Sequence, residues 1–285
     1  MAALSPLVFT PEQQQAAYMD RVRRCQEYIA AGDIYQANLS HRFTVSCDAF
    51  TGREAFQTDL LAYDRVHTMN PSPFSGLLRF DDIRFLSCSP ERLVRLSGRQ
   101  ADTRPIAGTR PRGHSIADDR RLTDELRANE KERAEHVMLV DLERNDLGRV
   151  CDFGSLRVDE FMALEQYSHV NHLVSNITGR LRDGATGFDL LRAVFPGGTI
   201  TGVPKIRCME VIEELEPVRR GVYTGSMGYI SWSGDLDFNI LIRTLVIRNG
   251  RGSLQVGAGI VADSDPAREY EETLYKAQAF FSAFS

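Results

Sequence analysis

Two Glu-x-x-Glu pairs, far apart in the chain, have the residue types and spacing to bind a metal ion. Glu132 and Glu135 lie in NEKERAEHVMLVDLERND, and Glu269 and Glu272 lie in REYEETLYKAQAFF. Side chains three residues apart are neighbours on a helix, so each pair would share one helical face. Four converging carboxylates without a Cys or His cluster suit a hard cation such as Mg²⁺, which retains water and accepts an anionic ligand.

The same pattern has an ordinary explanation, because charged helices commonly carry Glu-x-x-Glu on a solvated face. Two glycine-rich, uncharged segments strengthen the metal hypothesis, FPGGTITGVPK at 195–205 and VGAGIVAD at 256–263. Such segments are not typical of a charged surface, and they indicate a site to which the glutamate pairs belong.

Composition limits the class of protein. The chain has 285 residues, of which 42% are hydrophobic and 26% charged, enough for one large core or two smaller ones. No apolar run reaches the roughly 20 residues that cross a bilayer, and the N-terminus lacks a secretory signal. We therefore predict a cytoplasmic protein without a membrane partner. A net charge of −5 gives no footprint for nucleic acid, although the arginines of 103–113 could bind a small anion.

The five cysteines argue against a disulfide framework or a zinc site. Their number is odd, and none forms a CxxC or Cys/His spacing. We expect reduced, structural thiols at Cys25, Cys47, Cys88, Cys151 and Cys208.

In the first third of the chain, the pattern predicts helices that lead into strands. The first helix is expected from an N-cap near Thr10 to a stop at Gly32. The expected elements that follow are a strand at 34–47, a helix at 52–63, a turn at 70–74, and strands at 75–80, 83–90 and 92–98. The last three strands would form an antiparallel meander.

The remainder continues with alternating helix and strand groups. A long charged helix is expected at about 118–143. After it we expect strand-like segments at 150–158 and 171–181, helices at 187–194 and 205–217, strands at 223–232, 237–249 and 252–261, and a helix at 266–282. The NGRG turn at 249–252 predicts a hairpin between the last two strands.

No repeat or linker divides the chain, so we predict one α/β or α+β domain over residues 1–285, with 1–14 as a possible flexible start. Strand groups separated by helix groups favour antiparallel sheets. A nucleotide-binding protein is a weaker alternative, because GTITGVPK departs from a phosphate-binding loop at Val-Pro before Lys205, and VGAGIVAD lacks GxGxxG.

Over about residues 15–283 the chain resembles the chorismate-utilising enzymes, which include anthranilate, aminodeoxychorismate, isochorismate and salicylate synthases. The resemblance rests on an ordered set of segments: GDIYQANLSHRF, SPERL, RPIAGTRPRG, ERAEH to LERNDLGRVC, HLVS, FPGGTITGVPK, the IRT strand, VGAGIVADS and EYEETLYKA. It implies a sandwich of two large, mostly antiparallel sheets with outer helices and an active site in a cleft. The chain begins near the point where the family's catalytic core starts and lacks most of the N-terminal portion with which family members bind regulatory tryptophan. The resemblance therefore implies no feedback inhibition by tryptophan.

The resemblance implies roles for individual residues. It implies that the two glutamate pairs bind Mg²⁺, some of them through water. The groups that would hold the two carboxylates of chorismate are Tyr223, Arg243, Lys276 and the backbone of Gly257, Ala258 and Gly259. Guanidinium and backbone N–H groups bind carboxylates well. Taken alone, Arg243 and Tyr223 would also be explained without a ligand, Arg243 as a member of a structural ion pair and Tyr223 as a core residue.

Glu91, in SPERL, resembles the general acid that protonates the departing C4 hydroxyl group. Such an acid needs a raised pKa, which a closed site can supply. His172 resembles a residue near the ring, although a hydrogen-bonded core histidine would also explain it. Thr199 resembles a residue near the leaving hydroxyl.

Gln36 and Ala107 indicate which of the family's reactions the chain catalyses. Family members that add water to chorismate carry a lysine base at the position of Gln36, so glutamine implies ammonia as nucleophile. YQANLSHRF, NPSPFSGLL and LSCSPERL resemble aminodeoxychorismate synthase component I, which we favour. Ala107 in PIAGT instead resembles anthranilate synthase, because many aminodeoxychorismate synthases carry a nucleophilic lysine there.

The resemblance further implies a partner, a glutamine amidotransferase that supplies ammonia, since nothing in this chain resembles a Cys-His-Glu glutaminase. Two alternatives to aminodeoxychorismate synthesis stay open at this point. One is anthranilate synthase component I, which makes anthranilate and pyruvate. The other is a catalytically idle subunit that binds chorismate or a partner without turnover.

Overall fold

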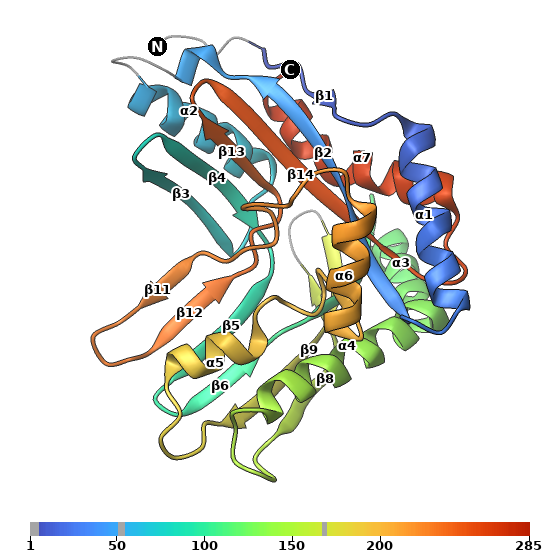
Figure 1. The fold of residues 1–285 in the computed structure, drawn as a ribbon, viewed down its shortest axis with the longest axis vertical. Coiled ribbons are helices and arrows are strands. Elements are labelled where there is room, and N and C mark those ends of the chain that lie inside the picture. Colours follow the sequence, from blue (N-terminus) through green and yellow to red (C-terminus); the bar gives the residue numbers. More distant parts are fainter. Residues whose placement is uncertain (1–5, 51–54, 167–169) are drawn as a thin grey trace. The chain divides into compact units, whose positions relative to one another are not determined.

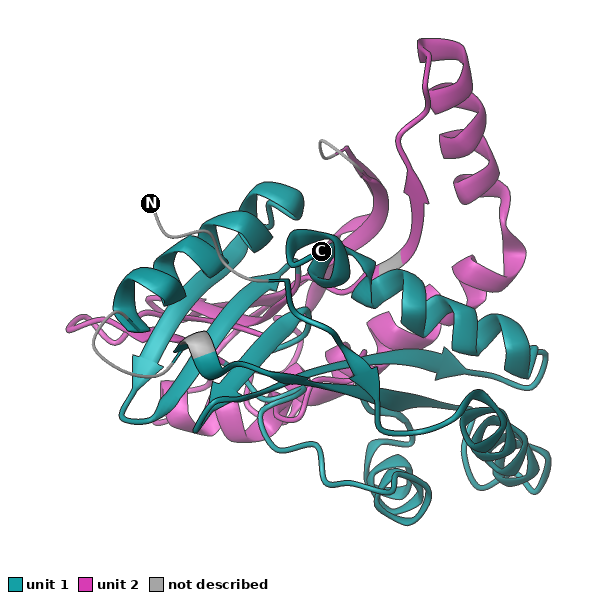
Figure 2. Ribbon diagram, turned by 90° about the horizontal axis from the view of Figure 1, so that it is seen from above, with its two compact units in different colours: residues 1–90, 200–226, 240–285 teal, residues 91–199, 227–239 magenta. Residues whose placement is uncertain are grey.

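A computed structural model describes residues 6–50, 55–166 and 170–285. By their internal contacts they form two compact units, each assembled from separate stretches of chain (Figure 2). Unit 1 comprises 1–90, 200–226 and 240–285, and unit 2 comprises 91–199 and 227–239. Each unit contains one seven-stranded sheet. Each ladder in both sheets is antiparallel, which confirms the predicted pair of large antiparallel sheets.

In unit 1 the strands follow the order β1-β2-β14-β13-β4-β3 (Figure 1). The short strand β10 pairs with the first two residues of β2, on the edge opposite β14. The strands are β1 (Thr10–Pro11), β2 (Gln36–Ser46), β3 (Phe74–Phe80), β4 (Ile83–Ser89), β10 (Gly202–Val203), β13 (Thr244–Arg248) and β14 (Arg251–Ile260). The helices are α1 (Gln15–Ala30), the 3₁₀ turn η1 (Asp48–Phe50), α2 (Ala55–Met69), α6 (Lys205–Leu215) and α7 (Pro266–Ala283).

One face of the unit 1 sheet is apolar and packs against helices. Because side chains alternate along a strand, Leu254 and Val256 of β14 join Phe43 of β2 in a core with α2 and α7. Further along the same strands, Ala258 and Leu39 pack with α1 and α6. The residues between these positions, such as Gln36, Asn38, Gly257 and Gly259, therefore face away from that core.

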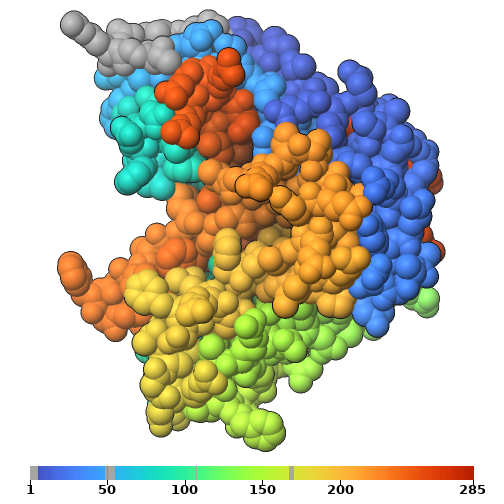
Figure 3. Space-filling model, viewed as in Figure 1, coloured from blue at the N-terminus to red at the C-terminus, as the bar shows by residue number. Residues whose placement is uncertain are grey.

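Helices of unit 1 show how side chains fix where a helix starts and how helices pack. Asp265 caps α7 by accepting hydrogen bonds from the amides of Ala267 and Arg268, and Pro266 occupies the first turn. The helices α1 and α6 lie side by side on the surface (Figure 3), where Glu214 accepts from both Arg24 and Tyr28.

Unit 2 has the strand order β11-β12-β5-β6-β9-β7, and β8 pairs with β9 on its other side. Its strands are β5 (Arg92–Ser97), β6 (Gln100–Thr103), β7 (Ile106–Pro111), β8 (Arg157–Gln166), β9 (Val170–Arg180), β11 (Gly228–Ile230) and β12 (Leu236–Asn239). Its helices are α3 (Ile116–Ala128), α4 (Glu130–Gly148) and α5 (Gly187–Val194). In α5 the predicted range is confirmed, and Thr186 and Asp189 form a capping box.

Two predicted helices have different boundaries. The first begins at Gln15 rather than after Thr10, because Thr10 and Pro11 pair with Thr44 and Phe43 as β1. Gly32 does end it, at a φ of +79°. The second helix continues to Met69, beyond the predicted residue 63, and positions 52–54 of its expected start lie outside the described residues.

The predicted long helix at 118–143 is two helices. Asn129 between them has extended backbone angles, φ −69° and ψ 106°, and its side chain accepts a hydrogen bond from the amide of Glu132. Asparagine is a strong N-cap because its side chain satisfies an otherwise unpaired amide. The break therefore starts a new helix three residues before the first glutamate pair.

Strands expected to be continuous are divided between the two sheets. The meander ends after β3 and β4, since β5 pairs with β6 and β12 in the other sheet. The expected strand at 237–249 becomes β12 and β13, with Arg243 between them at a φ of +48°. Of 150–158, only Arg157 and Val158 belong to a strand.

The hairpin predicted from NGRG is confirmed. Arg248 pairs with Arg251, and Asn249 and Gly250 form the turn with φ values of +50° and +72°. Positive φ at both central residues is the requirement of the tight hairpin turn that Asn-Gly favours. Among the helices that the described residues form, none is both long and apolar enough to cross a membrane.

Candidate active site

On one side of the second half of β14, no strand formed by the described residues pairs with it, so this edge is open. Leu254 is the last residue of β14 that pairs with β13, whereas pairing with β2 continues to Ile260. In an antiparallel hairpin closed by a two-residue turn, alternate residues direct their backbone groups to the partner strand. That alternation directs the backbone of Gly257 and Gly259 to the open edge. The edge thus offers main-chain groups to a ligand or side chain.

Glycine is required at Gly257 because two polar side chains lie where a Cβ atom would be. That atom would stand 2.4 Å from the Tyr223 hydroxyl oxygen and 2.8 Å from Nδ2 of Asn38. Asn38 Nδ2 also donates to the Tyr223 hydroxyl at 3.3 Å, and the guanidinium of Arg220 lies 5.4 Å from the Tyr223 ring centre. The predicted residues Tyr223 and Gly257 are therefore neighbours.

Gln36 lies beside the other glycine of this edge. Its side-chain nitrogen is 2.5 Å from the position of a Cβ on Gly259, and Gln36 is only 7% exposed. Its Oε1 atom is buried and has no hydrogen-bond partner among the described residues. A buried carbonyl oxygen without a donor is costly, so this atom is ready to accept from a bound molecule.

Helix α7 supplies one glutamate pair and the predicted lysine. Lys276 Nζ donates to the Gly257 carbonyl oxygen at 2.8 Å and lies 2.7 Å from Oε1 of Glu272. Glu269 is buried. Burial raises the pKa of Tyr18, and the charges of Glu269 and Glu272 raise it further, which places both glutamates near α1.

Arg243 and Ala258 complete the predicted residues of unit 1. Arg243 is half-buried, and its carbonyl oxygen accepts from the Cys88 amide. Its positive φ is uncommon for a residue with a Cβ and marks a locally strained backbone. Ala258 is fully buried in the core, so only its backbone can serve a ligand.

In unit 2, the pair Glu132 and Glu135 shares one face near the start of α4. Glu132 Oε1 forms an ion pair with Arg110 at 2.7 Å, and Glu135 lies 4.0 Å from Lys131. The other oxygen of Glu132, Oε2, is buried and has no hydrogen-bond partner among the described residues. It lies 2.5 Å from where a Cβ on Gly108 would stand.

Strand β7 joins this pair to His172. Thr109 Oγ1 is 2.9 Å from Nδ1 of His172, which is buried on β9, while the next residue, Arg110, reaches Glu132. The register shifts between Ala107 and Thr109, where Gly108 has a φ of +70°. Ala107 pairs with Leu173, and its side chain lies outside what the structure describes.

Glu91 and Thr199 lie in the connections between secondary-structure elements. Glu91 directly precedes β5 and is 6% exposed. Thr199 follows α5, and its hydroxyl oxygen is buried without a hydrogen-bond partner among the residues described. A buried carboxyl group and a buried hydroxyl suit proton transfer and recognition of a polar ligand, respectively.

The predicted site residues thus fall into two groups, one in each unit. Within the described ranges, no three His, Cys, Asp or Glu side chains gather closely enough to hold a metal ion. The donor chemistry still fits Mg²⁺, because both pairs offer only carboxylate oxygens and a cation would satisfy the buried Oε2 of Glu132. A four-glutamate site that closes on one substrate stays a prediction.

The arginines of 103–113 have carboxylate partners. Arg104 pairs with Glu160 and Glu165, and Arg110 with Glu125 and Glu132. These pairs leave their guanidinium groups engaged with acids rather than open to a small anion.

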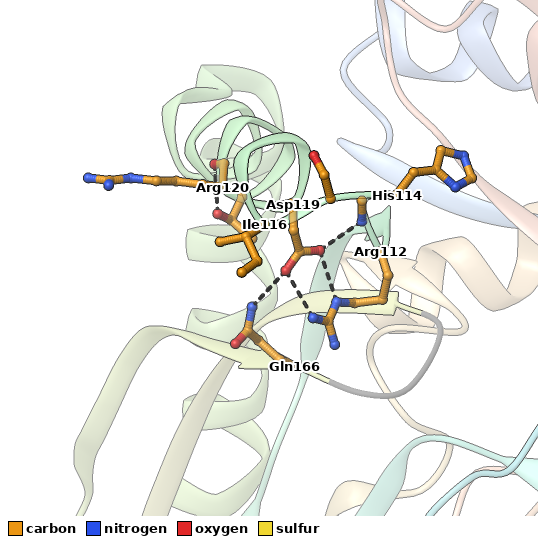
Figure 4. A pocket seen from close by; sticks show the side chains of 9 residues that line it. Arg112, His114, Ile116, Asp119, Arg120 and Gln166 are labelled. Atoms are coloured by element: carbon orange, nitrogen blue, oxygen red, sulfur yellow. Dashed lines mark hydrogen bonds and ion pairs between the residues drawn. The ribbon is translucent and has the colours of Figure 1, made fainter.

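Arg112, the remaining arginine, holds Asp119 beside a surface cavity of about 600 Å³ at the start of α3 (Figure 4). Asp119 also accepts from the Gly113 amide and from Gln166. The Arg112 guanidinium, the Gly113 amide and Asn171 hold the pKa of the Asp119 carboxyl well below its usual range. The cavity is lined by residues of this structural network, and no predicted site residue is among them.

Sequence reasoning missed two buried histidines beside the glutamate helices. His41 on β2 contacts Thr273 of α7, and His136 of α4 contacts Ser175 of β9. Burial lowers the pKa of each to about 4. The adjacency of Glu135 to His136 was visible in the sequence, but nothing there links His41 to residue 273.

Comparison with known proteins gives consistent matches. A family model described as chorismate binding enzyme matches residues 3–282. The anthranilate synthase component I-like protein of Synechocystis sp. is 55% identical over 277 residues, or 97% of this chain and 56% of that protein. Aminodeoxychorismate synthase component 1 of Bacillus subtilis is 52% identical over 262 residues, or 92% of this chain and 54% of that protein.

A solved structure agrees with these matches. The crystal structure of anthranilate synthase component I from Streptococcus pneumoniae matches with a TM-score of 0.88 and 40% identity, covering 99% of this chain and 61% of that one. This likeness confirms the fold that the sequence resemblance implied. The chain spans about half the length of the curated relatives it matches.

Proposed function

Because the chain belongs to the family of chorismate binding enzymes, we propose that it acts as component I of an aminodeoxychorismate synthase, which aminates chorismate at C4. The product keeps its enolpyruvyl group, so no pyruvate is released. The observation that carries amination is Gln36, a buried amide beside the open edge of β14, whose carbonyl oxygen has no hydrogen-bond partner in the part of the chain that the structure describes. An amide cannot take a proton from water, but it can accept a hydrogen bond from ammonia.

The unit 1 residues fit the binding of a dicarboxylate. Backbone groups of Gly257 and Gly259 at the open edge, together with the Tyr223 hydroxyl, can donate to carboxylate oxygens. Lys276, which reaches this edge, adds positive charge. Hydrogen bonds that involve a charged partner are the strong ones, so a few such donors suffice to hold the two carboxylates of chorismate.

The unit 2 residues fit the chemical step. In the proposed reaction Glu91 gives a proton to the C4 hydroxyl group, the C4–O bond breaks, and water leaves. Ammonia forms the new C4–N bond, and the resulting ammonium group releases a proton that restores the acid. The overall change consumes chorismate and ammonia and yields aminodeoxychorismate and water.

The two glutamate pairs are the residues that would hold Mg²⁺. When bound, the ion supplies positive charge that offsets the charge of the dianionic substrate. The chain's own contribution is to supply carboxylate oxygens, and the buried Oε2 of Glu132, which has no hydrogen-bond partner among the described residues, is one that a cation would satisfy.

Anthranilate synthesis is the second candidate, and Ala107 favours it. A covalent adduct at C2 formed by lysine is impossible with alanine, so an external nucleophile would have to take that part. Anthranilate synthase would aminate C2 and then eliminate pyruvate. Three segments that resemble aminodeoxychorismate synthase outweigh this one position in our proposal, and the Bacillus subtilis relative of that name is 52% identical.

The ammonia source in this proposal is a separate glutamine amidotransferase. The relatives from Bacillus subtilis and Streptococcus pneumoniae are both named as a first component, which fits a second subunit. Free ammonium should replace that subunit in vitro. A cytoplasmic location also stays a prediction.

Product analysis tests the proposal. The protein is incubated with chorismate, Mg²⁺ and ammonium, with and without an aminodeoxychorismate lyase, and products are separated and identified by mass. Aminodeoxychorismate, or 4-aminobenzoate once the lyase is added, is the expected result. Anthranilate with pyruvate would replace the proposal by the second candidate. Chorismate binding without turnover would instead identify an idle subunit.

A further inference from the structure

In both units, the residue directly after the second glutamate is completely buried and joins its helix to a strand. Thr273 follows Glu272 on α7, and His136 follows Glu135 on α4. Both side chains are 0% exposed. Each makes a hydrogen bond between an imidazole ring and a hydroxyl group, although the two helices occupy different units and contribute opposite halves of that bond.

In unit 1 the strand supplies the imidazole. His41 Nδ1 of β2 lies 3.1 Å from Thr273 Oγ1, and the same hydroxyl donates to the Tyr270 carbonyl oxygen at 2.7 Å. The imidazole is enclosed by the rings of Tyr18, Phe43 and Tyr270, with centroid distances between 4.4 and 5.5 Å. The ring cannot turn away from Thr273 without displacing these neighbours.

In unit 2 the helix supplies the imidazole. His136 Nε2 bonds to Ser175 Oγ of β9, and Ser175 is also fully buried. The same oxygen accepts from the Met162 amide at 3.0 Å. Met162 has a φ of +51° beside a shift of register between β8 and β9, so Ser175 connects α4 to an irregular part of the sheet.

Helix geometry makes these bonds effective at controlling the glutamates. With 3.6 residues per turn, residues one and four positions before the bonded residue lie about 100° and 40° away around the axis. Both glutamates of a pair are thus close to the bond. At a radius of about 5–6 Å, a helix rotation of about 10° would move a side chain by about 1 Å. Metal and catalytic groups need placement to about 0.5 Å.

We propose that the His41–Thr273 and His136–Ser175 bonds are positioning clamps, which set the rotation of α7 and α4 so that each glutamate pair presents its carboxylates to one divalent cation. The inference rests on the proposed function, because that function assigns the cation to these glutamates. The clamps touch neither cation nor substrate. They act through the rigid connection between each bonded residue and the glutamate before it.

Two matched pairs of variants test the clamps in the full chain. Thr273→Val removes the hydroxyl at nearly constant volume, whereas Thr273→Ser keeps it. His136→Asn is too short to reach Ser175, whereas His136→Gln places its amide where Nε2 stood. The probe is Mn²⁺ alone, which suits the same oxygen ligands as Mg²⁺, with free ion measured by electron paramagnetic resonance.

We expect Thr273→Val and His136→Asn each to weaken Mn²⁺ binding about tenfold, in the range found when groups that orient metal ligands are removed. Thr273→Ser and His136→Gln should bind Mn²⁺ nearly as the unaltered chain does. The controls are Ser87→Ala in unit 1 and Ser155→Ala in unit 2. They remove hydroxyls that bond to Thr244 and Asp152, away from the glutamate helices, and should leave Mn²⁺ binding unchanged.

The bonds can also be broken from the strand side, with His41→Gln and Ser175→Ala, so a misfolded helix variant does not prevent a decision. Equal Mn²⁺ affinity in all folded variants would overturn the clamps, even if the chain aminates chorismate. No Mn²⁺ binding by the unaltered chain would overturn them together with the proposed metal site. A product other than aminodeoxychorismate, with Mn²⁺ affinity lost as expected, would overturn the proposed function alone.

Discussion

The two units contribute different kinds of chemical group to the proposed reaction. In unit 1 the candidate surface is largely backbone, because Gly257 and Gly259 expose main-chain groups at the open edge of β14. In unit 2 it consists of side chains, with Glu91 before β5 and His172 bonded to Thr109. Main-chain groups are well suited to holding carboxylates, whereas proton transfer needs a titratable side chain. Apart from Gln36, which we propose accepts a hydrogen bond from ammonia, the candidate residues of unit 1 therefore suit binding, and those of unit 2 suit proton transfer.

The units also differ in what their sequences imply about the product. The segments YQANLSHRF, NPSPFSGLL and LSCSPERL, which resemble aminodeoxychorismate synthase, contribute to β2, β3 and β4 of unit 1, although the last three residues of LSCSPERL belong to unit 2. Ala107, which resembles anthranilate synthase, lies on β7 of unit 2. If proton transfer takes place in unit 2, Ala107 lies nearer to the chemical step than the three segments do, and it would have the larger effect on which product forms.

The largest effect should come from unit 2, at Glu91. Glu91→Gln removes the proposed acid while keeping the size of the side chain, so kcat should fall by about 10²–10⁴-fold with little change in chorismate affinity. Steady-state kinetics with ammonium and equilibrium binding of chorismate measure the two effects. Glu213→Gln, on an exposed side chain of α6, is the control. A loss of affinity that accounts for the whole defect would remove Glu91 from the chemical step.

The second largest effect should be at Gly257 in unit 1, where we expect a change in KM rather than in kcat. A Cβ atom there would meet Tyr223 and Asn38. Gly257→Ala should therefore displace the carboxylate-binding groups and raise KM for chorismate by about 10²-fold, the scale of a 1 Å misplacement. The same strand provides the control Ser253→Ala. A variant that lowered kcat and left KM unchanged would contradict the division of roles between the units.

A smaller effect concerns stability in acid, to which the buried histidines of both units contribute and for which His41 is the test in unit 1. Burial lowers the pKa of His41 to about 4, so between pH 6.5 and 4 the unfolded chain binds a proton there that the folded chain does not. The contribution of neutral His41 to the free energy of unfolding is complete above pH 6.5. As the pH falls from 6.5 toward 4, the free energy of unfolding decreases by roughly 1–3 kcal/mol. Urea unfolding at pH 7 and pH 4.5 measures the loss. His41→Asn should show a smaller pH dependence, and an unchanged slope would refute the assignment.

The smallest expected effect is a change in product ratio at Ala107. Ala107→Lys supplies the nucleophile that many aminodeoxychorismate synthases carry, so the ratio of aminodeoxychorismate to anthranilate should rise a few-fold, equivalent to less than about 1.4 kcal/mol in relative barriers. Mass analysis of the products at equal turnover gives the ratio, with Ala107→Met as a control for side-chain size. No change in the ratio would show that the unit 1 segments, not position 107, determine the product.

Much of the local structure followed from the sequence because its causes are local. Asn249 and Gly250 suffice for the hairpin turn, and Thr186 with Asp189 suffices to start α5. The break at Asn129 was missed, although asparagine is a strong N-cap, because the charged pattern continues through it. Thr10 looked like an N-cap, but its backbone pairs with β2 instead, and pairing with a distant strand is not visible in a local pattern.

The sequence by itself determined the family, the types of the candidate site residues and the glutamate spacing, since spacing of three on a helix places side chains together in any fold. Only the tertiary structure decided that the pairing of β14 with β13 stops at Leu254, which leaves Gly257 on an open edge, and that Lys276 reaches this edge. It alone joined His41 to Thr273 across 232 positions. Contacts of this kind depend on how helices and strands pack after chain entropy has been overcome, which no short segment encodes.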